Sequence, residues 1–396
     1  MSQNFTNSKQ IVVQDTAAKS AFGELRVTSL VPRAAWTFAY NIIDELVHTT
    51  LSGSGVVSQN AGRCKLESGA STNSSAKVAT RKSIQYMPGA GALMRFTCVF
   101  DTPKAGNTQI IGLANGNDGL YFGYNGTAFG VCRKRAGVET WTTQANWNSN
   151  TCPWLTPQFG NVYQIDLQWL GYGAIRFYIE DINTGDFTLV HTIFYAGTSV
   201  DVSIMNPSLP IEMININTTN NTNITMYSPS AMAFQECPSI ADYDNPLSVF
   251  RTVHTSKASV STETPILLMK NDTTLSGITN RLIMDFSLTN LLTASNKTSH
   301  FRFIRNPTLG GTPPVYTNVL LNQSPALYDG TLTGVTYSAG TGIERFHASL
   351  NPSDRLTQDL HPIGLNLLPG ETLLVTGMTA GTNGDMDVSL FWSVTF

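Results

Sequence analysis

The last ten residues, DVSLFWSVTF, largely alternate apolar and polar side chains. In an extended strand this spacing places Val388, Leu390, Trp392, Val394 and Phe396 on one face. Burying each of these side chains stabilises the fold by roughly 1.5–3 kcal/mol as an upper value, and a one-residue shift of the strand would expose them all. The sequence therefore predicts a terminal strand with a fixed register against a hydrophobic core.

Short alternating runs separated by turn residues fill most of the chain after residue 75. In AIRFYIED, Ile175, Phe177 and Ile179 share one face of the expected strand. In GLYFGYNGTAFGV, Asn125 and Gly126 predict the two central residues of a type I′ turn between strands. Because no amphipathic helices separate these runs, the pattern indicates an all-β protein built from β-sandwiches.

The length indicates two β domains, because 396 residues exceed what one hydrophobic core usually accommodates. The number of expected strands fits sandwiches of the jelly-roll or concanavalin-like kind. Near the N-terminus, AAWTFAYNIIDELV has a spacing that fits either a helix or a strand, and the sequence leaves it unassigned. We expect an extended N-terminal arm and linker over residues 1–75, a lectin-like β-sandwich over 76–236, a linker over 237–249 and a second, jelly-roll-like β-sandwich over 250–396.

Charged residues make up only 13% of the chain, about half the usual share, and Thr, Ser, Asn and Gly take their place. Polar but weakly charged surfaces are common in extracellular and viral β proteins. A net charge of −3 gives no general reason to expect nucleic-acid binding. The N-terminal MSQNFTNSKQ lacks the apolar core of a signal peptide, and no apolar run has the length of a transmembrane helix. We therefore expect a protein made in the cytosol, with no membrane span.

The sequence contains no pattern that predicts an enzyme, a cofactor or a metal site. Glu180 and Asp181 are adjacent, so in a strand they point to opposite faces and cannot form a glycosidase pair. His191 shares a face with apolar residues, which favours a core position over a catalytic one. The five cysteines are widely spaced, and Cys98 alternates with phenylalanines as a buried apolar residue would.

Aromatic residues are dense in one third of the chain, and aromatic rings both stack on sugars and anchor protein interfaces. The alternative is that most of them fill the core of the sandwich. Trp147 and Trp154 flank NSNTCP, an expected loop, so they are the strongest candidates for a surface role. The aromatic candidates for contact with a glycan or a partner are Tyr121, Tyr124, Trp141, Trp147 and Trp154.

The run CRKRAG places Arg133, Lys134 and Arg135 together beside an expected turn. The simpler interpretation is the solvated tip of a hairpin. The alternative is a contact with an acidic neighbouring subunit or with packaged nucleic acid, which three charges in a chain of net charge −3 cannot establish.

Several stretches resemble a virion-associated family of β-sandwich structural proteins found in large DNA viruses and tailed phages. The stretches are AFGELRV, RKSIQYMPGAGALMRFTCVF, NDGLYFGYNGTAFGV, ANWN, YQIDLQWLGYGAIRFYIEDINTGDFTLVHTI with NPSLPIEMININTT, and LLPGETLLVTG with DVSLFWSVTF. The resemblance is specific in the first expected domain and weaker in the second, and it brings no catalytic residues with it.

The resemblance implies a structural component of the virion, such as a minor capsid, penton-like vertex or fibre-like protein. Such a protein would act in a homo-oligomer with other capsid proteins as its partners, and its location would be the virion, assembled in the host cytoplasm. The alternative is a lectin-like attachment protein on the virion surface that binds a host-surface glycan through the aromatic candidates.

Overall fold

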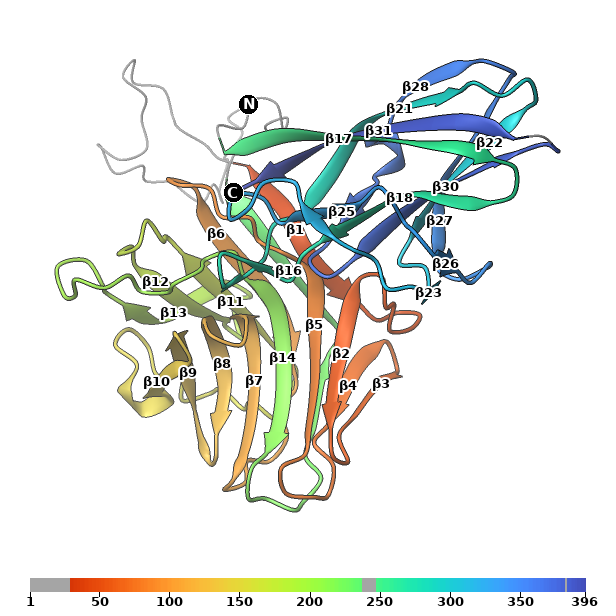
Figure 1. The fold of residues 1–396 in the computed structure, drawn as a ribbon. Coiled ribbons are helices and arrows are strands. Elements are labelled where there is room, and N and C mark those ends of the chain that lie inside the picture. Colours follow the sequence, from red (N-terminus) through yellow and green to blue (C-terminus); the bar gives the residue numbers. More distant parts are fainter. Residues whose placement is uncertain (1–28, 237–246, 382) are drawn as a thin grey trace, which may run out of the picture.

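The computed structural model describes residues 29–236, 247–381 and 383–396, and this part of the chain is all β (Figure 1). Neighbouring strands pair antiparallel throughout these ranges. The helical content described consists of two single 3-10 turns, η1 (Gln144–Asn146) and η3 (His361–Ile363). In the same ranges, no helix has the length and apolar character needed to span a bilayer. The all-β prediction is therefore confirmed.

The first half of the chain forms two large sheets, and in Figure 1 the seven-stranded one occupies the lower front, running from β10 to β2. A small third sheet lies beside them. The six-stranded sheet has the order β1 (Leu30–Thr37), β16 (Ser230–Glu236), β6 (Gly91–Cys98), β11 (Asn161–Leu167), β12 (Ile175–Glu180), β13 (Phe187–Ile193). The seven-stranded sheet has the order β10 (Val138–Thr143), β9 (Ala128–Arg135), β8 (Gly119–Asn125), β7 (Asn107–Ala114), β14 (Pro210–Asn217), β5 (Ser75–Ser83), β2 (Val47–Ser52). The third has the order β15 (Thr225–Ser228), β4 (Arg63–Glu67), β3 (Val56–Asn60).

An aromatic cluster fills the space between the two large sheets. The rings of Phe96 and Tyr163 stack with centroids 5.2 Å apart, and Phe122 meets Phe177 edge-on at 5.4 Å. The alternation predicted for AIRFYIED is confirmed, because Ile175, Phe177 and Ile179 are all completely buried. Such ring pairs add about 0.5–1.5 kcal/mol each beyond the burial of their area.

The second half of the chain builds two more sheets around a separate core, in the upper part of Figure 1. Two small two-stranded sheets accompany them, β19 (Thr274–Leu275) with β20 (Ile278–Thr279) and β23 (Leu309–Gly311) with β26 (Val335–Tyr337). One sheet has the order β17 (Ser248–Val260), β31 (Gly384–Thr395), β21 (Met284–Thr293), β28 (Arg355–Asp359), with β29 (Asn366–Leu367) also on β21. The other has the order β24 (Thr317–Asn318), β25 (Ala326–Asp329), β18 (Thr264–Asn271), β30 (Thr372–Thr379), β22 (Ser299–Arg305), β27 (Ile343–Leu350).

The terminal strand β31 lies between β17 and β21 with the register that its sequence predicts. Val388, Leu390 and Trp392 are completely buried, and Val394 is 2% exposed. Phe396 differs, because it follows the end of the strand and is 41% exposed. The alternation therefore predicts the buried face correctly, except at the last residue.

The expected arm over residues 1–75 is wrong for its described part, residues 29–75. These residues supply β1 to β4 and the first residue of β5, and Trp36, Phe38 and Leu66 lie in the core of the first half. AAWTFAYNIIDELV contains the end of β1, with Ala34 and Trp36 buried, and Phe38 directly after the strand is buried too. Residues 38–46 form no helix or strand, and β2 begins at Val47. Residues 1–28 of the arm, and 237–246 of the expected linker, lie outside the described residues.

The turn predicted at Asn125 and Gly126 is displaced by one residue. Asn125 pairs with Ala128, which leaves Gly126 and Thr127 as the loop, and Gly126 has a φ of +63°. A two-residue turn with both φ angles positive occurs instead in the next hairpin, at Ala136 and Gly137. The prediction that Asn125 and Gly126 are the two central residues of the turn is therefore wrong by one residue.

Candidate functional site

The outer face of the seven-stranded sheet carries a continuous row of registered residues, which we call the outer row. The neighbours of its members along each strand, such as Val78, Ile111, Phe122, Val131 and Met213, belong to the core between the sheets. Because side chains alternate along a strand, the members themselves point away from that core. From β2 to β10 the outer row consists of His48, Ala79, Glu212, Gly112, Tyr121, Cys132 and Trp141.

Two positions in the middle of this face, Gly112 and Gly123, are glycine because a side chain there would meet the backbone of a neighbouring strand. A Cβ on Gly112 would lie 1.9 Å from the carbonyl oxygen of Leu120, and one on Gly123 would lie 2.0 Å from that of Gln109. Gly123 also pairs with Gly130 in the adjacent row. These glycines are themselves buried, and Ile110, Tyr121 and Cys132 form a small buried cluster near them, between an aromatic end and a charged end.

Trp141 lies at the aromatic end, on the edge strand β10, and is half-buried. Its indole Nε1 donates a hydrogen bond of 3.0 Å to Glu139 Oε2, and Lys134 Nζ lies 3.5 Å from Glu139 Oε1. Tyr121 is only 1% exposed, and its ring lies where a side chain on Gly119 would stand. Burial raises the pKa of Tyr121, and the carboxylate of Glu212 raises it further. Of the two predicted aromatics on this face, Trp141 is the one accessible to a ligand.

The charged end is formed by three residues that the sequence did not single out. Lys77 Nζ and Glu212 Oε1 are 2.6 Å apart, and the Glu212 side chain is only 4% exposed. His48 lies on the neighbouring strand, where burial lowers its pKa and the cations Lys77, Arg81 and Arg281 lower it further. These residues come from β2, β5 and β14, which are far apart in sequence. The one signal was a carboxylate inside the apolar run PIEMININ.

The other predicted aromatics fill the core. Tyr124 is 5% exposed and accepts a 2.8 Å hydrogen bond from Gln158 Nε2. Trp147 is 6% exposed and meets Phe122 edge-on at 6.2 Å, while Trp154 is half-buried against the same core. The surface role expected for Trp147 therefore does not fit its burial.

The loop around Trp147 is held down by side chains that the sequence did not reveal. Asn148 Nδ2 donates to the Thr192 carbonyl at 2.8 Å, and the Thr192 amide donates to Asn148 Oδ1 at 2.9 Å. His191 Nδ1 accepts from the Asn148 amide and is 8% exposed, as its predicted core position requires. These hydrogen bonds fix the loop to β13, and Trp147 in that loop points into the core.

The basic residues beside the β9–β10 turn are engaged within the chain. Arg133 Nη1 donates a 2.9 Å hydrogen bond to the Ser203 carbonyl, and its guanidinium lies 5.2 Å from the centre of the Tyr195 ring. Lys134 approaches Glu139, as described above, and Arg135 Nη2 lies 3.3 Å from Asp201 Oδ1. The three side chains therefore have partners in this chain.

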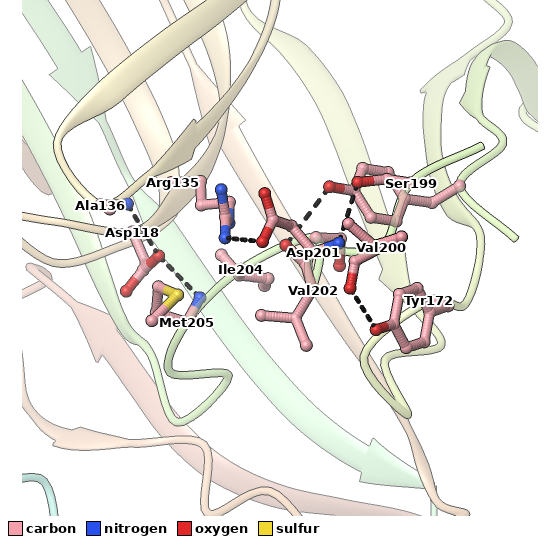
Figure 2. A network of polar contacts seen from close by, with 12 residues as sticks. Asp118, Arg135, Ala136, Tyr172, Ser199, Val200, Asp201, Val202, Ile204 and Met205 are labelled. Carbon is pink, nitrogen blue, oxygen red and sulfur yellow. Dashed lines mark hydrogen bonds and ion pairs between the residues drawn. The ribbon is translucent and has the colours of Figure 1, made fainter.

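Figure 2 shows how this hairpin and the segment 199–205 are held together. Asp118 Oδ1 accepts hydrogen bonds from the amides of Met205, at 2.9 Å, and Ala136, at 3.4 Å. Tyr172 Oη donates to the Val200 carbonyl at 2.7 Å. With the Arg135 ion pair and the hydrogen bond from Arg133 to Ser203, these contacts hold the loop, while Lys134 pairs with Glu139 on β10.

The two carboxylates of the outer face are widely separated. Glu212 and Glu139 lie four strands apart, about 19 Å along the sheet at a strand spacing of about 4.8 Å. The two carboxyl groups of a glycosidase stand about 5–9.5 Å apart, so this pair does not meet that requirement. Across residues 29–236, 247–381 and 383–396, no three His, Cys, Asp or Glu side chains gather so as to hold a metal ion. Four cysteines, including Cys98, are free and buried, which confirms the apolar role predicted for Cys98.

Comparison with known proteins gave structural likenesses only. No family model matches the sequence, and no curated protein matches it. The structure of the cellulose induced protein Cip1 aligns with 50% of this chain and 95% of its own, at 14% identity and a TM-score of 0.33.

Two further likenesses are similar in extent. Crh5 transglycosylase, solved in complex with NAG, aligns with 54% of this chain and 89% of its own, at 14% identity and a TM-score of 0.37. Arcelin-5, a lectin-like defense protein from Phaseolus vulgaris, aligns with 52% of this chain and 100% of its own, at 10% identity and a TM-score of 0.34. At such TM-scores these likenesses carry no argument about the function of this chain.

Proposed function

We propose that this protein binds carbohydrate on the outer face of its seven-stranded sheet. We also propose that its first half is a concanavalin-like sandwich and its second half a jelly-roll-like one. The observation that carries the binding proposal is the half-buried Trp141 on the edge strand β10, with Glu139 and Lys134 beside it.

This arrangement suits a sugar because the apolar face of a pyranose ring stacks on an aromatic ring. Glu139, bonded to the indole of Trp141, and Lys134 lie next to it and offer an acceptor and a donor for hydroxyl groups. A few polar groups around an aromatic platform are typical of binding sites that fix the orientation of a ligand.

A glycan array followed by calorimetry tests this proposal. We expect Trp141→Ala to weaken binding by about tenfold or more, with a melting temperature close to that of the wild type. Tyr40→Ala is the matched control, since Tyr40 is 94% exposed and lies outside the seven-stranded sheet. Wild-type protein that binds no glycan, or unchanged affinity in Trp141→Ala, would rule out this site.

A second function is favoured by an exposed apolar patch, and here we propose assembly as a structural component of a virion. Ile278, Leu320 and Leu321 are 64%, 40% and 65% exposed. They belong to two adjacent segments, because Ser276 Oγ donates a 3.1 Å hydrogen bond to the Asn322 carbonyl. Exposed apolar patches mark sites of interaction with other molecules, and under this proposal these are other copies or other capsid proteins.

Light scattering of the purified protein and imaging of purified particles test the assembly proposal. We expect a homo-oligomer that Leu321→Asp converts to smaller species, whereas Val200→Asp, at an exposed apolar site outside the patch, leaves it intact. A wild-type monomer that is absent from particles would exclude this role and leave the binding proposal standing.

A further inference from the structure

A second site lies where the two halves of the chain meet, at the charged end of the outer row. A cavity of about 170 Å³ is lined by residues of both halves. Water occupies about 30 Å³ per molecule in the liquid, so this volume holds several waters or one small polar group. The first half contributes His48, Lys77 and Arg81, and the second half contributes Arg281.

The cavity concentrates positive charge in a chain whose net charge is −3. Three cations, Lys77, Arg81 and Arg281, face one carboxylate, Glu212, which gives a formal excess of two positive charges. Glu212 is already paired with Lys77. The lowered pKa of His48 has burial as its main cause and these three cations as the next, so the imidazole adds no charge at neutral pH.

Arg281, which lines this cavity, has unused hydrogen-bonding capacity. Its Nε is buried, and no acceptor for it exists among the described residues. Burial also lowers the pKa of Arg281, against the attraction of Glu212 and Asp118. A guanidinium presents its donors in a planar fork that matches an oxyanion, and a buried donor without an acceptor costs free energy.

We propose that this cavity binds an oxyanion, a sulfate, phosphate or carboxylate group, held by Arg281 from one half and by Lys77 and Arg81 from the other. The group is a free ion or the acidic substituent of a larger ligand such as a glycan. This site is separate from the Trp141 site, and binding at it would also fasten the two halves together, since the lining residues come from both.

Calorimetry on the full chain tests the proposal, with chloride used to hold the ionic strength constant. The first probes are inorganic sulfate and phosphate. The second are a sulfated and a uronic-acid disaccharide, each beside its uncharged counterpart. We expect saturable binding that Arg281→Gln weakens by about tenfold or more and Arg281→Lys weakens less. Arg355→Gln, at an exposed position with the same change of charge, is the control and should bind as the wild type does.

The binding results distinguish the possible ligands and can overturn the proposal. Binding of the inorganic ions supports a free-ion site, and binding of the acidic sugars alone supports a glycan substituent. No saturable binding of any probe, or equal affinity in Arg281→Gln, overturns the proposal. Arg81→Gln repeats the test from the other half if Arg281→Gln fails to fold. Trp141→Ala should keep its affinity for sulfate, so failure of the carbohydrate proposal would be seen separately.

Discussion

Lys77 on β5 and Glu212 on β14 form an ion pair across neighbouring strands, with 2.6 Å between Nζ and Oε1. The Glu212 side chain is 4% exposed and the Lys77 side chain 25%. The pair sits diagonally in the ladder, because Lys77 is opposite Ile214 while Glu212 is opposite Ala79. The carboxylate is therefore buried on the outer face of the sheet, and the lysine supplies its nearest countercharge.

Removing the lysine should leave the carboxylate without its closest partner. We expect Lys77→Met to lower the free energy of unfolding by about 2–3 kcal/mol, measured by urea denaturation. The double variant Lys77→Met/Glu212→Gln should recover part of that loss. Lys65→Met is the control, because the Lys65–Glu67 pair is more exposed and should contribute less than about 1 kcal/mol. Equal losses in both single variants would contradict the buried role of Glu212.

Gly112 should tolerate no side chain, because its Cβ would lie 1.9 Å from the carbonyl oxygen of Leu120. We expect Gly112→Ala to destabilise the protein by about 3 kcal/mol or more, since the backbone of two strands would have to separate. Gly160→Ala is the matched control, with its nearest contact at 3.8 Å, and should change stability by less than about 0.5 kcal/mol. Thermal unfolding of both variants gives the comparison, and a stable Gly112→Ala would show that the sheet can widen there.

The alternation of side chains made most of the core predictable. Val388 to Val394 and Ile175 to Ile179 are buried as expected, because a period of two determines the inward face once a strand exists. The position of Trp36 was harder to predict, because the spacing of the apolar residues around it fits both a helix and a strand. Its segment is a strand because β1 pairs with β16. That pairing joins residues about 200 positions apart, such as Trp36 and Ala231, so the local sequence does not predict it.

The candidate sites were less predictable than the core, for a related reason. The density of aromatic residues pointed to Trp141, which is half-buried on an edge strand, and equally to Trp147, whose loop is fixed against the core by Asn148. The charged end depends on His48 and Glu212, which occupy one row only because β5 brings β2 and β14 together. Residues that come singly from separate strands form no motif with a fixed spacing, so the sequence does not predict that they lie together.

The terminal strand gives a matched pair of core and surface residues. Trp392 is completely buried, and Phe396 is 41% exposed. We expect Trp392→Ala to lower the free energy of unfolding by about 3–5 kcal/mol, because it empties a large volume in the core. Phe396→Ala should change it by less than about 0.5 kcal/mol. Urea denaturation distinguishes the two, and similar losses would mean that Phe396 is also part of the core.

His48 should make stability depend on pH below neutrality. Its pKa in the folded state is lowered from 6.5, first by burial and then by Lys77, Arg81 and Arg281. Above pH 6.5 both states are neutral at this residue, so it contributes no slope. As the pH falls below 6.5 the unfolded chain binds the proton first, and the folded state loses stability until its own lowered pKa is passed.

Melting temperatures measured from about pH 8 to about pH 5 check this behaviour. We expect His48→Gln to reduce the loss of stability at acid pH. Some loss should remain, because burial also lowers the pKa of His191. His254→Gln, at an exposed position, serves as the control. If His48→Gln and the wild type lose stability in parallel, the imidazole of His48 is not held neutral by its surroundings.

Substitutions of Trp147 test whether this residue has a core role or a surface role. Its ring meets Phe122 and Phe129 edge-on, each at 6.2 Å, and its buried Nε1 has no acceptor among the described residues. Trp147→Phe keeps an aromatic ring in place and removes the unpartnered N–H, so it should cost less than about 1 kcal/mol. Trp147→Ala empties the site and should cost about 3–5 kcal/mol. Urea denaturation measures both, and a nearly unchanged Trp147→Ala would return this residue to the surface role that its loop suggested.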